Sequence, residues 1–435
     1  MRRYGIVWLL LGLGALQAES YRELIGRLEN SPLLKSAALM KEAAGEKVLA
    51  AEGKNLPMLD LYLQGAWLKD TPTMTLHFPG LPGPTAPVPM GKTRQFVGEL
   101  RLSYPLFTGF AVTAQIDRSR WEAERARLKT MDLKRNLILQ LTQLYGTVRA
   151  TRKVLAAQEE AKKAMLSALE KAKGLYKNGL LPPADLYNIQ AKVYEVEARL
   201  AQTRSRISQL MNRLTYLTGS PVASISGGIT LQSLPSPGRL KEQADSKRSD
   251  LKALQAALKV DEAMIRLAES RYYPTVGVAA GLKRHGDTPA LNGDGFTNAD
   301  QSYMGVNLSW NLFNGQSDRH NAEAARYKQL ASAAQLLDYR RRVATEIDNA
   351  YLDLRTLNAK LHSAQMQVKA QAEYCRLTRG RFDNQLAGAD ELSRSIADLA
   401  NAKARVGALE EQIRIQRAKI WLLSGVENFE KALGR

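Results

Sequence analysis

Residue types that perform catalysis or bind metals are few in this 435-residue chain, and they lie far apart. The four histidines show no spacing typical of metal ligands (His77, His285, His320, His362). The single cysteine, Cys375, lies within a helical heptad pattern, where a lone thiol behaves as a small apolar residue. No nucleotide-binding or nucleophile motif stands in its required context. These residues predict no enzyme activity, no metal site and no cofactor.

The net charge of +19 raises the question of nucleic-acid binding. Lys and Arg are interleaved with Asp and Glu along the predicted helices, for example at 122–125 and 410–414. This pattern is typical of solvated helical faces, whereas a nucleic-acid site gathers its cations on one face. We therefore expect no nucleic-acid partner.

The first residues resemble a targeting segment. Arg2 and Arg3 precede an apolar run at 6–16, which has the length of a signal-peptide core and is too short to span a bilayer. We expect a signal peptide at 1–18 with cleavage after Ala18, and an N-terminal anchor helix is the alternative. No cysteine lies near this position for lipid attachment, and no later apolar run reaches the ~18 residues of a transmembrane helix.

Two very long helical hairpins dominate the rest of the chain. The first, at 111–216, has a proline-free outgoing arm at 111–177, which would be about 100 Å long. Its turn is at 178–183, and its return arm begins at Ala184. The second, at 316–423, goes out over 322–381, turns at Gly388 and returns over 390–423. Apolar residues recur every seven positions along the arms, as in a coiled coil (Leu399, Val406, Ile413, Ile420).

Each hairpin is preceded by a helix and two strands. Residues alternate between apolar and polar in four segments, which predicts amphipathic strands at about 58–69, 95–104, 275–283 and 302–310. Helices are predicted at 21–53 and 250–269, and long loops at 71–91 and 284–301. We expect an irregular connector at 220–247 and a C-terminal tail at 426–435.

These elements form an internal repeat. The pattern Leu-Phe-x-Gly occurs at 106–109 and again at 312–315, an offset of 206 residues, and Tyr145 and Tyr351 have the same offset. Such a sustained register indicates two structural repeats, at 19–219 and 248–425. Each consists of a helix, two strands and a long hairpin.

Four strands with one apolar face cannot form a closed structure alone. Membrane barrels begin at about eight strands, and open sheet edges invite further pairing. Either several copies of the chain pool their strands, or the sheet packs on soluble helices. The first option predicts an obligate oligomer. Three copies would supply twelve strands, although the strands themselves do not fix the number of copies.

At this point the chain resembles the TolC-type outer-membrane efflux protein family. The resemblance rests on the two strand-to-helix junctions, 104–109 and 310–315, and on the two hairpin tips, 176–186 and 381–392. It implies an α+β membrane protein in the outer membrane of a Gram-negative bacterium. In this family three chains form a twelve-stranded β-barrel within outer-membrane lipid, and the barrel continues as a periplasmic α-helical tunnel.

The same resemblance implies the function and the partners. The homotrimer would be the passive exit duct of a tripartite efflux or type I secretion system. It would work with a periplasmic adaptor protein and an inner-membrane pump of the resistance-nodulation-division, ABC or major-facilitator type.

The resemblance also carries over to particular residues. The gate at the helix tips is expected to include Asp390, with Glu391 and Asp383 as further acidic candidates, because Ser393 occupies the family's second acidic position. Asp390 has an alternative role as N-cap of the return helix. The expected adaptor contacts are Gly179, Leu180, Asp185, Leu186, Gln385, Leu386 and Leu392. The residues of the strand-to-helix junctions are Pro105, Phe107, Gly109, Phe313 and Gly315. Gly179 is expected to adopt a left-handed turn conformation.

Two other classes of protein share some of these features. A periplasmic adaptor has helical hairpins but combines them with compact β-rich domains, and usually with an anchor. A structural coiled-coil protein of the envelope would not need amphipathic strands of bilayer-spanning length. The strands fused directly to the hairpins favour the channel over both.

Overall fold

The computed structural model describes residues 18–75, 80, 87–293 and 300–434. The expected signal segment, except Ala18, and parts of both predicted long loops lie outside these ranges. The chain divides into two compact units. The sheet unit comprises 41–126 and 254–336, and the helical unit comprises the described residues of 1–40, 127–253 and 337–435.

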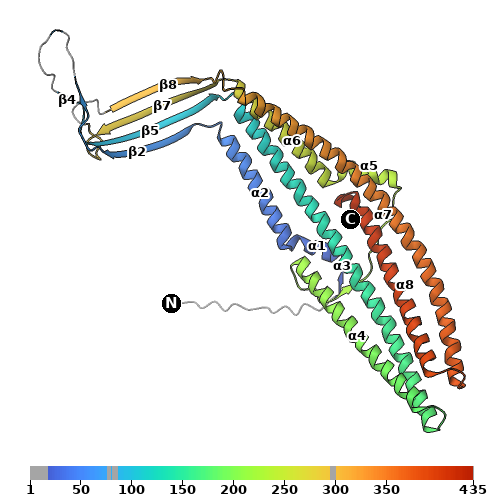
Figure 1. Ribbon diagram of the computed structural model, residues 1–435. Coiled ribbons are helices and arrows are strands. Elements are labelled where there is room, and N and C mark those ends of the chain that lie inside the picture. Colours follow the sequence, from blue (N-terminus) through green and yellow to red (C-terminus); the bar gives the residue numbers. More distant parts are fainter. Residues whose placement is uncertain (1–17, 76–79, 81–86, 294–299, 435) are drawn as a thin grey trace, which may run out of the picture. The chain divides into compact units, whose positions relative to one another are not determined.

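The sheet unit contains four antiparallel strands in the order β2, β5, β7, β8 (Figure 1). Their bounds are Met58–Trp67, Arg94–Phe107, Thr275–Gly286 and Asp300–Ser309. The two repeats meet at the centre of this sheet, where Leu100 of β5 lies opposite Leu282 of β7. Within the described chain, β2 and β8 each have one unpaired edge. A short hairpin of β3 (Thr73–Met74) and β4 (Val88–Pro89) lies in the predicted proline-rich loop.

The two junctions between a strand and a long helix have the same backbone conformation. Gly109 and Phe110 have φ of +59° and +67°, and Gly315 and Gln316, 206 residues later, have +68° and +67°. At Gly109 a Cβ atom would lie 2.5 Å from the carbonyl oxygen of Ser270, so that only glycine fits without a shift of the backbone. The internal repeat therefore extends to individual backbone conformations.

The helical unit contains most of the two hairpins. α3 (Ala111–Lys177) and α4 (Pro183–Thr218) form the first, and α7 (Ser317–Asp383) and α8 (Ala389–Leu423) form the second. The predicted bounds of α3 are confirmed. α7 begins five residues before its predicted start at 322 and ends two residues past its predicted end at 381. Among the described residues, no helix combines the length and the apolar character that a membrane crossing requires.

Both hairpin tips have the same helix-ending turn. Gly179 has a φ of +69°, as predicted, and the residue 206 positions later, Gln385, has a φ of +63°. In each tip this residue donates its amide to the carbonyl three positions back, and the next residue donates to the carbonyl five positions back. The four bonds are Gly179 to Tyr176 (3.0 Å), Leu180 to Leu175 (2.9 Å), Gln385 to Phe382 (3.0 Å) and Leu386 to Arg381 (2.7 Å). This is the Schellman arrangement, in which the left-handed residue satisfies the last helical carbonyls.

The segment at 21–53 was predicted as one helix, but the structure divides it into two helices. The chain forms α1 (Tyr21–Arg27), a 3₁₀ turn at Leu28–Asn30, and α2 (Pro32–Gly53). Pro32 disfavours a helical conformation at the residue before it, and Ser31 accordingly has a ψ of 130°. The corresponding helix of the second repeat, α6 (Ser249–Glu269), begins close to its predicted start and ends in a 3₁₀ turn at Ser270–Tyr272.

The connector and the C-terminal tail contain more regular structure than we expected. Within 220–247, β6 (Ile225–Ser226) pairs in parallel with β1 (Glu19–Ser20), and α5 spans Pro237–Lys247. Pro237 stands at the first position of α5, where its missing amide hydrogen costs nothing. In the tail, α9 spans Val426–Ala432.

Two hydrophobic clusters hold the helical unit together. The first brings together α1, α3, α4 and α9, with Tyr21, Tyr145, Leu214 and Phe429 among its buried members. The second lies near the hairpin tips and combines the four long helices through residues such as Met165, Ile189, Phe382 and Leu392.

Candidate functional site

Asp390 lies in the first turn of α8 but does not cap the helix. The N-cap is Gly388, which has extended backbone (φ −78°, ψ 161°), so the alternative role of Asp390 as N-cap is wrong. Gly388 itself lies, as predicted, in the turn between α7 and α8. The Oδ2 atom of Asp390 instead accepts a hydrogen bond from Arg394 Nη2 at 2.5 Å. An acidic residue in the first turn still interacts favourably with the helix dipole.

All three carboxylates that we predicted for the gate are paired with cations of the same chain. The ion pairs are Asp390 with Arg394 (2.5 Å), Glu391 with Arg381 (3.0 Å) and Asp383 with Lys171 (2.9 Å). All six side chains are at least a third exposed. Exposed pairs contribute about 0–1 kcal/mol each, because solvent and salt screen them. The charges of these carboxylates are therefore balanced within the chain.

The three pairs differ in what they connect. The pairs of Asp390 and Glu391 lie within the second hairpin, whereas Lys171 of α3 and Asp383 of α7 connect the two hairpins. Arg381 also donates to the carbonyl oxygen of Leu386 at 3.1 Å and so braces the second tip internally. Lys171–Asp383 is thus an exposed contact between hairpins that a partner or a change in salt can break.

Asp390 also borders a cavity of about 180 Å³ between α4 and α8. Lys192, Glu195 and Arg199 line it from α4, and Asp390 and Arg394 line it from α8. The hydrogen bond from Lys192 and the positive charge of Arg199 lower the pKa of Glu195, so this carboxylate stays ionised. The cavity is therefore lined by three cations and two carboxylates.

The residues expected to contact an adaptor have different degrees of exposure. Leu180 and Leu386 occupy equivalent positions in the two tips and are exposed, as are Gly179 and Gln385. Asp185 and Leu186 are half-buried. Leu392 is only 1% exposed and belongs to the core beneath the tip, so its expected contact with an adaptor is corrected to a packing role.

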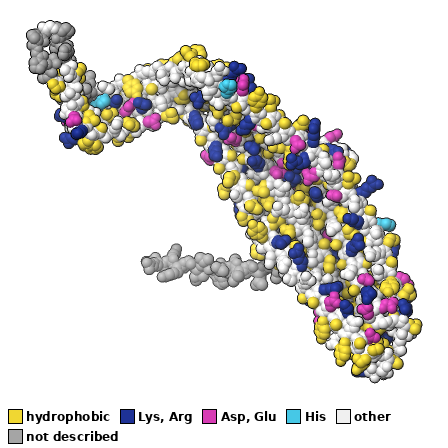
Figure 2. Space-filling view, in the orientation of Figure 1, with side chains coloured by type: hydrophobic (Ala, Val, Ile, Leu, Met, Phe, Trp, Pro, Cys, Tyr) yellow, Lys and Arg dark blue, Asp and Glu magenta, His cyan; other side chains and the backbone are white. Residues whose placement is uncertain are grey.

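The sheet has one apolar and one polar face. Leu61, Leu63, Met304 and Val306 share the apolar face, and all are more than 65% exposed on the isolated chain. Figure 2 shows hydrophobic side chains among charged ones over the strands, and side chains of both charges mixed over the helices.

The polar face carries a hydrogen-bonded group. Glu99 Oε1 accepts bonds from Tyr303 Oη (2.6 Å) and Arg101 Nε (2.9 Å). The ring of Tyr303 crosses β7 above Gly281, where a Cβ would come within 2.5 Å of it. The two faces thus differ in the way that a sheet between lipid and water requires.

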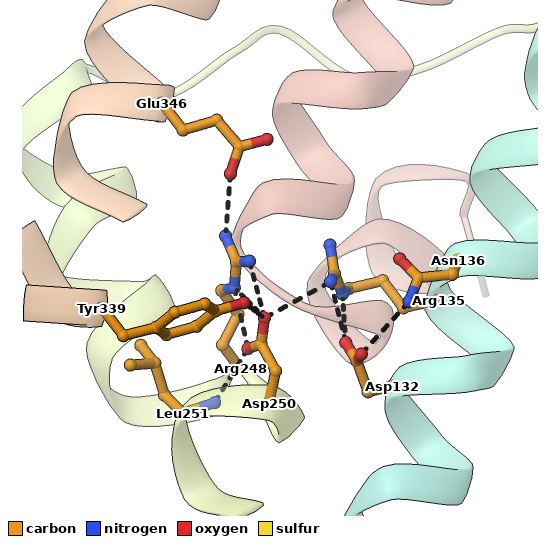
Figure 3. Close-up of polar contacts among 8 residues, drawn as sticks. All are labelled: Asp132, Arg135, Asn136, Arg248, Asp250, Leu251, Tyr339 and Glu346. Carbon is orange, nitrogen blue, oxygen red and sulfur yellow. Dashed lines mark hydrogen bonds and ion pairs between the residues drawn. The ribbon is translucent and has the colours of Figure 1, made fainter. Parts of the chain in front are cut away.

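The sequence analysis missed a buried ionic network in the helical unit (Figure 3). Asp250 accepts hydrogen bonds from Arg248 Nη2 (2.6 Å) and Tyr339 Oη (2.7 Å), and Arg135 Nη2 lies 3.4 Å away. Burial alone would raise the pKa of Asp250, but the hydrogen bond and charge of Arg248, with help from Tyr339 and Arg135, lower it to about 2. Three residues, from α3, α7 and the turn between α5 and α6, thus hold the one ionised carboxylate of Asp250.

No sequence signal identifies this network, because the members are up to 204 positions apart. Arg248 and Asp250, two positions apart around the start of α6, are the only local hint. Arg248 is 3% exposed, and its second terminal nitrogen, Nη1, lies 3.7 Å from Glu346. Within the described residues, no group of three His, Cys, Asp or Glu side chains is arranged to hold a metal ion.

Several solved membrane proteins have a fold similar to that of this chain. The structure of CusC, described as undergoing conformational changes on transmembrane channel formation, has a TM-score of 0.78 and 16% identity, with 93% of this chain and 92% of CusC covered. The outer membrane protein VceC of Vibrio cholerae has a TM-score of 0.75 and 17% identity over 93% of this chain and 96% of VceC. The outer-membrane channel OprN has a TM-score of 0.74 and 17% identity, with 94% of this chain and 90% of OprN covered. These likenesses confirm the predicted fold of long hairpins and four strands.

Sequence comparison identifies the family. None of the curated proteins matches this chain in sequence. The family model for outer membrane efflux proteins matches residues 27–220 and 240–392, which together make up more than three quarters of the chain. This family consists of channels and is not a class of enzymes. The chain therefore belongs to the outer membrane efflux protein family, and it is an outer-membrane efflux channel, as the sequence predicted.

Proposed function

We propose that three copies of this chain form a passive exit duct, with a twelve-stranded barrel in the outer membrane and a helical tunnel in the periplasm. The observation that carries this proposal is the four-stranded sheet with an exposed apolar face and two open edges. Such a sheet is unstable in water, and lipid can cover its face only if another strand satisfies each edge.

The strand directions support closure between copies. All neighbours in the order β2, β5, β7, β8 are antiparallel, so β2 and β8 also run in opposite directions. When β8 of one copy pairs with β2 of the next, the new pair is antiparallel and the up-and-down pattern continues around the ring. The edge strands β2 and β8 have ten residues each. This length matches the roughly 9–11 residues that a tilted strand needs to span the apolar layer of a membrane.

The partners of this duct are a periplasmic adaptor protein and an inner-membrane pump. The resistance-nodulation-division, ABC and major-facilitator classes are all compatible with a passive exit. The exposed tips, with Leu180 and Leu386 at equivalent positions, are the surface that we assign to the adaptor. The energy for transport comes from the pump.

Membrane fractionation with chemical crosslinking tests the assembly. We expect the protein in the outer-membrane fraction, with crosslinked species that end at three chains. A monomer, or a protein recovered in the inner membrane or the soluble fraction, would contradict the duct.

We further propose that the Lys171–Asp383 pair is a latch that keeps the hairpin tips together in the closed channel. Replacing Lys171 by Met removes the only cation in this pair, and we expect a several-fold higher conductance in planar bilayers. Lys173→Met is the matched control, because Lys173 pairs within α3 with Glu170 and connects no hairpins. Equal conductance of both variants would show that the Lys171–Asp383 pair does not keep the tips closed.

Asp390 has a separate test, which concerns selectivity. If its carboxylate faces the permeating ions, Arg394→Ala removes the balancing charge and should increase the preference for cations, because carboxylates attract cations. Asp390→Ala should decrease that preference. Reversal potentials in a salt gradient measure both, and unchanged values would exclude Asp390 from the ion path.

A further inference from the structure

Within the four strands, the apolar face of the sheet carries charged residues only at the end where the loops lie. On β7 this face runs from Val276 to Leu282 without a charged residue, and the next position on it is Arg284. Asp300 of β8 lies opposite Arg284, and Arg94 occupies the corresponding end of β5. The other end of the sheet continues into α3 and α7. The charged end is therefore the one that lies away from these helices.

Arg284 lies at a depth that fits the level of lipid headgroups. It follows Val276 by eight residues, which is about 27 Å along the strand. At a tilt of about 40° this is about 20 Å of membrane depth, close to the apolar band of about 25 Å in membrane barrels. Trp67 and Phe96 are in edge-to-face contact at the same end, as aromatic residues often are at this boundary. Because the helical part is periplasmic, this end reaches the outer leaflet.

The loop that follows β7 folds onto the same face of the sheet. A Cβ at Gly98, which would project from the apolar face, would lie 2.7 Å from Leu291 Cδ1, and a Cβ at Gly286 would lie 2.8 Å from Leu291 Cα. The amide of Gly293 donates to the carbonyl oxygen of His285 at 2.8 Å, which ties the loop back to β7. Residues 287–293 therefore belong to the side of the sheet that we expect to face lipid.

The charged residues at this end, which we call the outer rim, are Lys92, Arg94, Arg284, Asp287 and Asp300. Lys92 Nζ donates to Asp287 Oδ2 at 2.7 Å. The hydrogen bond from Lys92 and, less strongly, the charge of Arg94 lower the pKa of Asp287, so both cations lie near this carboxylate. Arg284 donates to both carboxylate oxygens of Asp300. Among the described residues, no carboxylate forms an ion pair with Arg94. The outer rim thus has three cations for two carboxylates.

These cations can exchange their carboxylate partners for phosphate. The side chains of Lys92 and Arg284 are more than half exposed, and exposed ion pairs are weak, so a phosphate oxygen can compete for them. A guanidinium presents a planar fork of donors that matches two phosphate oxygens. On the lipid side of the sheet, at headgroup level, the nearest phosphate groups are those of the phosphorylated glycolipid of the outer leaflet.

We propose that Lys92, Arg94 and Arg284 bind the phosphate groups of this glycolipid, while the apolar face below them contacts its acyl chains. The bound lipid holds the sheet at a fixed level in the membrane. This inference rests on the proposed function only because the apolar face must meet lipid. All three cations belong to one chain, so the site does not depend on the number of copies in the assembly.

Native mass spectrometry of the purified full-length protein tests the site, with bisphosphorylated lipid A as the probe. The rim variant is Lys92→Gln/Arg94→Gln/Arg284→Gln. The matched control, Lys54→Gln/Arg271→Gln/Lys283→Gln, removes three cations of the same unit that lie at its helix end or on its polar face. We expect the rim variant to bind lipid A about tenfold more weakly than the parent, and the control to stay within about twofold of it. Equal binding by the parent and the rim variant, or an equal loss in both variants, would overturn the proposal.

Two further probes identify the ligand. Lipid A without its phosphate groups should bind the parent as weakly as bisphosphorylated lipid A binds the rim variant. Inorganic phosphate at the same concentration should not displace lipid A from the parent, because it has no acyl chains for the apolar face. Tight binding of the dephosphorylated lipid would show that the outer rim does not recognise phosphate. Displacement by inorganic phosphate would indicate a site for a free anion, and either result would overturn the proposal.

A single substitution keeps the test open if the rim variant does not fold. Arg94→Gln breaks no ion pair with a described residue, and we expect it to weaken lipid A binding about threefold. Unchanged binding by this variant would overturn the site. Crosslinking of the same samples separates this proposal from the duct. A parent that binds phosphorylated lipid A without forming trimers contradicts the duct alone, and a trimer that does not bind it contradicts the lipid site alone.

Discussion

At the scale of single residues, burial decides which charges matter for stability. The exposed pairs at the tips are weak, whereas Asp250 lies in a site with two arginines and a tyrosine. Asp250→Asn would leave the buried Arg248 with only the more distant carboxylate of Glu346, and breaking a buried ion pair costs about 3–5 kcal/mol in other proteins. We expect a clearly lowered melting temperature, measured by circular dichroism in detergent. Asp245→Asn, which removes an exposed partner of Arg340, is the control with little expected effect.

The same carboxylate gives a pH dependence. Its pKa is lowered from 3.8 to about 2 in the folded chain, so the folded state binds fewer protons than the unfolded state between these values. The stabilisation is fully present above about pH 4 and is lost as the pH falls toward 2. Thermal melting of the parent and of Asp250→Asn between pH 2 and 6 measures it. We expect the two curves to converge at the acidic end, and a constant difference would contradict the lowered pKa.

Residue roles could be predicted from the sequence only where the cause is local. Gly179 adopts the predicted left-handed conformation because a helix-ending turn requires it. The cap role of Asp390 was wrong because the backbone at Gly388, not the residue type at 390, sets where α8 begins. The Asp250 network could not be foreseen, since packing of α3, α6 and α7 brings its members together.

At the scale of elements, the two hairpin tips provide a matched pair of turns. The left-handed residue is Gly179 in one and Gln385 in the other. A residue with a Cβ pays about 1 kcal/mol or more for this conformation, whereas glycine does not. No atom lies within 4 Å of a Cβ at Gly179, so only the backbone conformation matters there.

This symmetry predicts opposite effects of two substitutions. Gly179→Gln should weaken the last turn of α3, and Gln385→Gly should strengthen the last turn of α7, each by roughly 1 kcal/mol. Exchange rates of the amides in those turns measure the effect as a factor of about five. If both changes shifted exchange in the same direction, the turn conformation would not be the cause.

Element prediction succeeded where periodic patterns were long and failed where they were short. The 67 residues of α3 contain no proline, so its bounds could be predicted. α5 is an 11-residue helix that begins at Pro237, and the prolines near it were interpreted as loop signals. The break at Ser31 was missed because the apolar pattern continues on both sides of Pro32.

At the scale of the whole molecule, the isolated chain is incomplete. Its sheet has unpaired edges at β2 and β8, and its most exposed large side chain on the apolar face, Met304, is 83% accessible. The repeat and the strand patterns of the sequence predict this incompleteness, because four amphipathic strands cannot close by themselves. The number of copies could not be predicted in the same way, since any number of four-stranded sheets can close with antiparallel pairing.

The two faces of β2 allow a direct test of lipid exposure. Leu61 lies on the apolar face opposite Leu100, and Gln64 lies on the polar face opposite Val97. An arginine that faces lipid near the bilayer midplane costs about 2–4 kcal/mol, and the cost recurs in every copy of the assembly. Leu61→Arg should therefore strongly reduce the crosslinked trimer in outer-membrane fractions, whereas Gln64→Arg should leave it close to the parent level. If both variants assemble equally well, the apolar face does not contact lipid, and the strands of neighbouring copies must be arranged in another way.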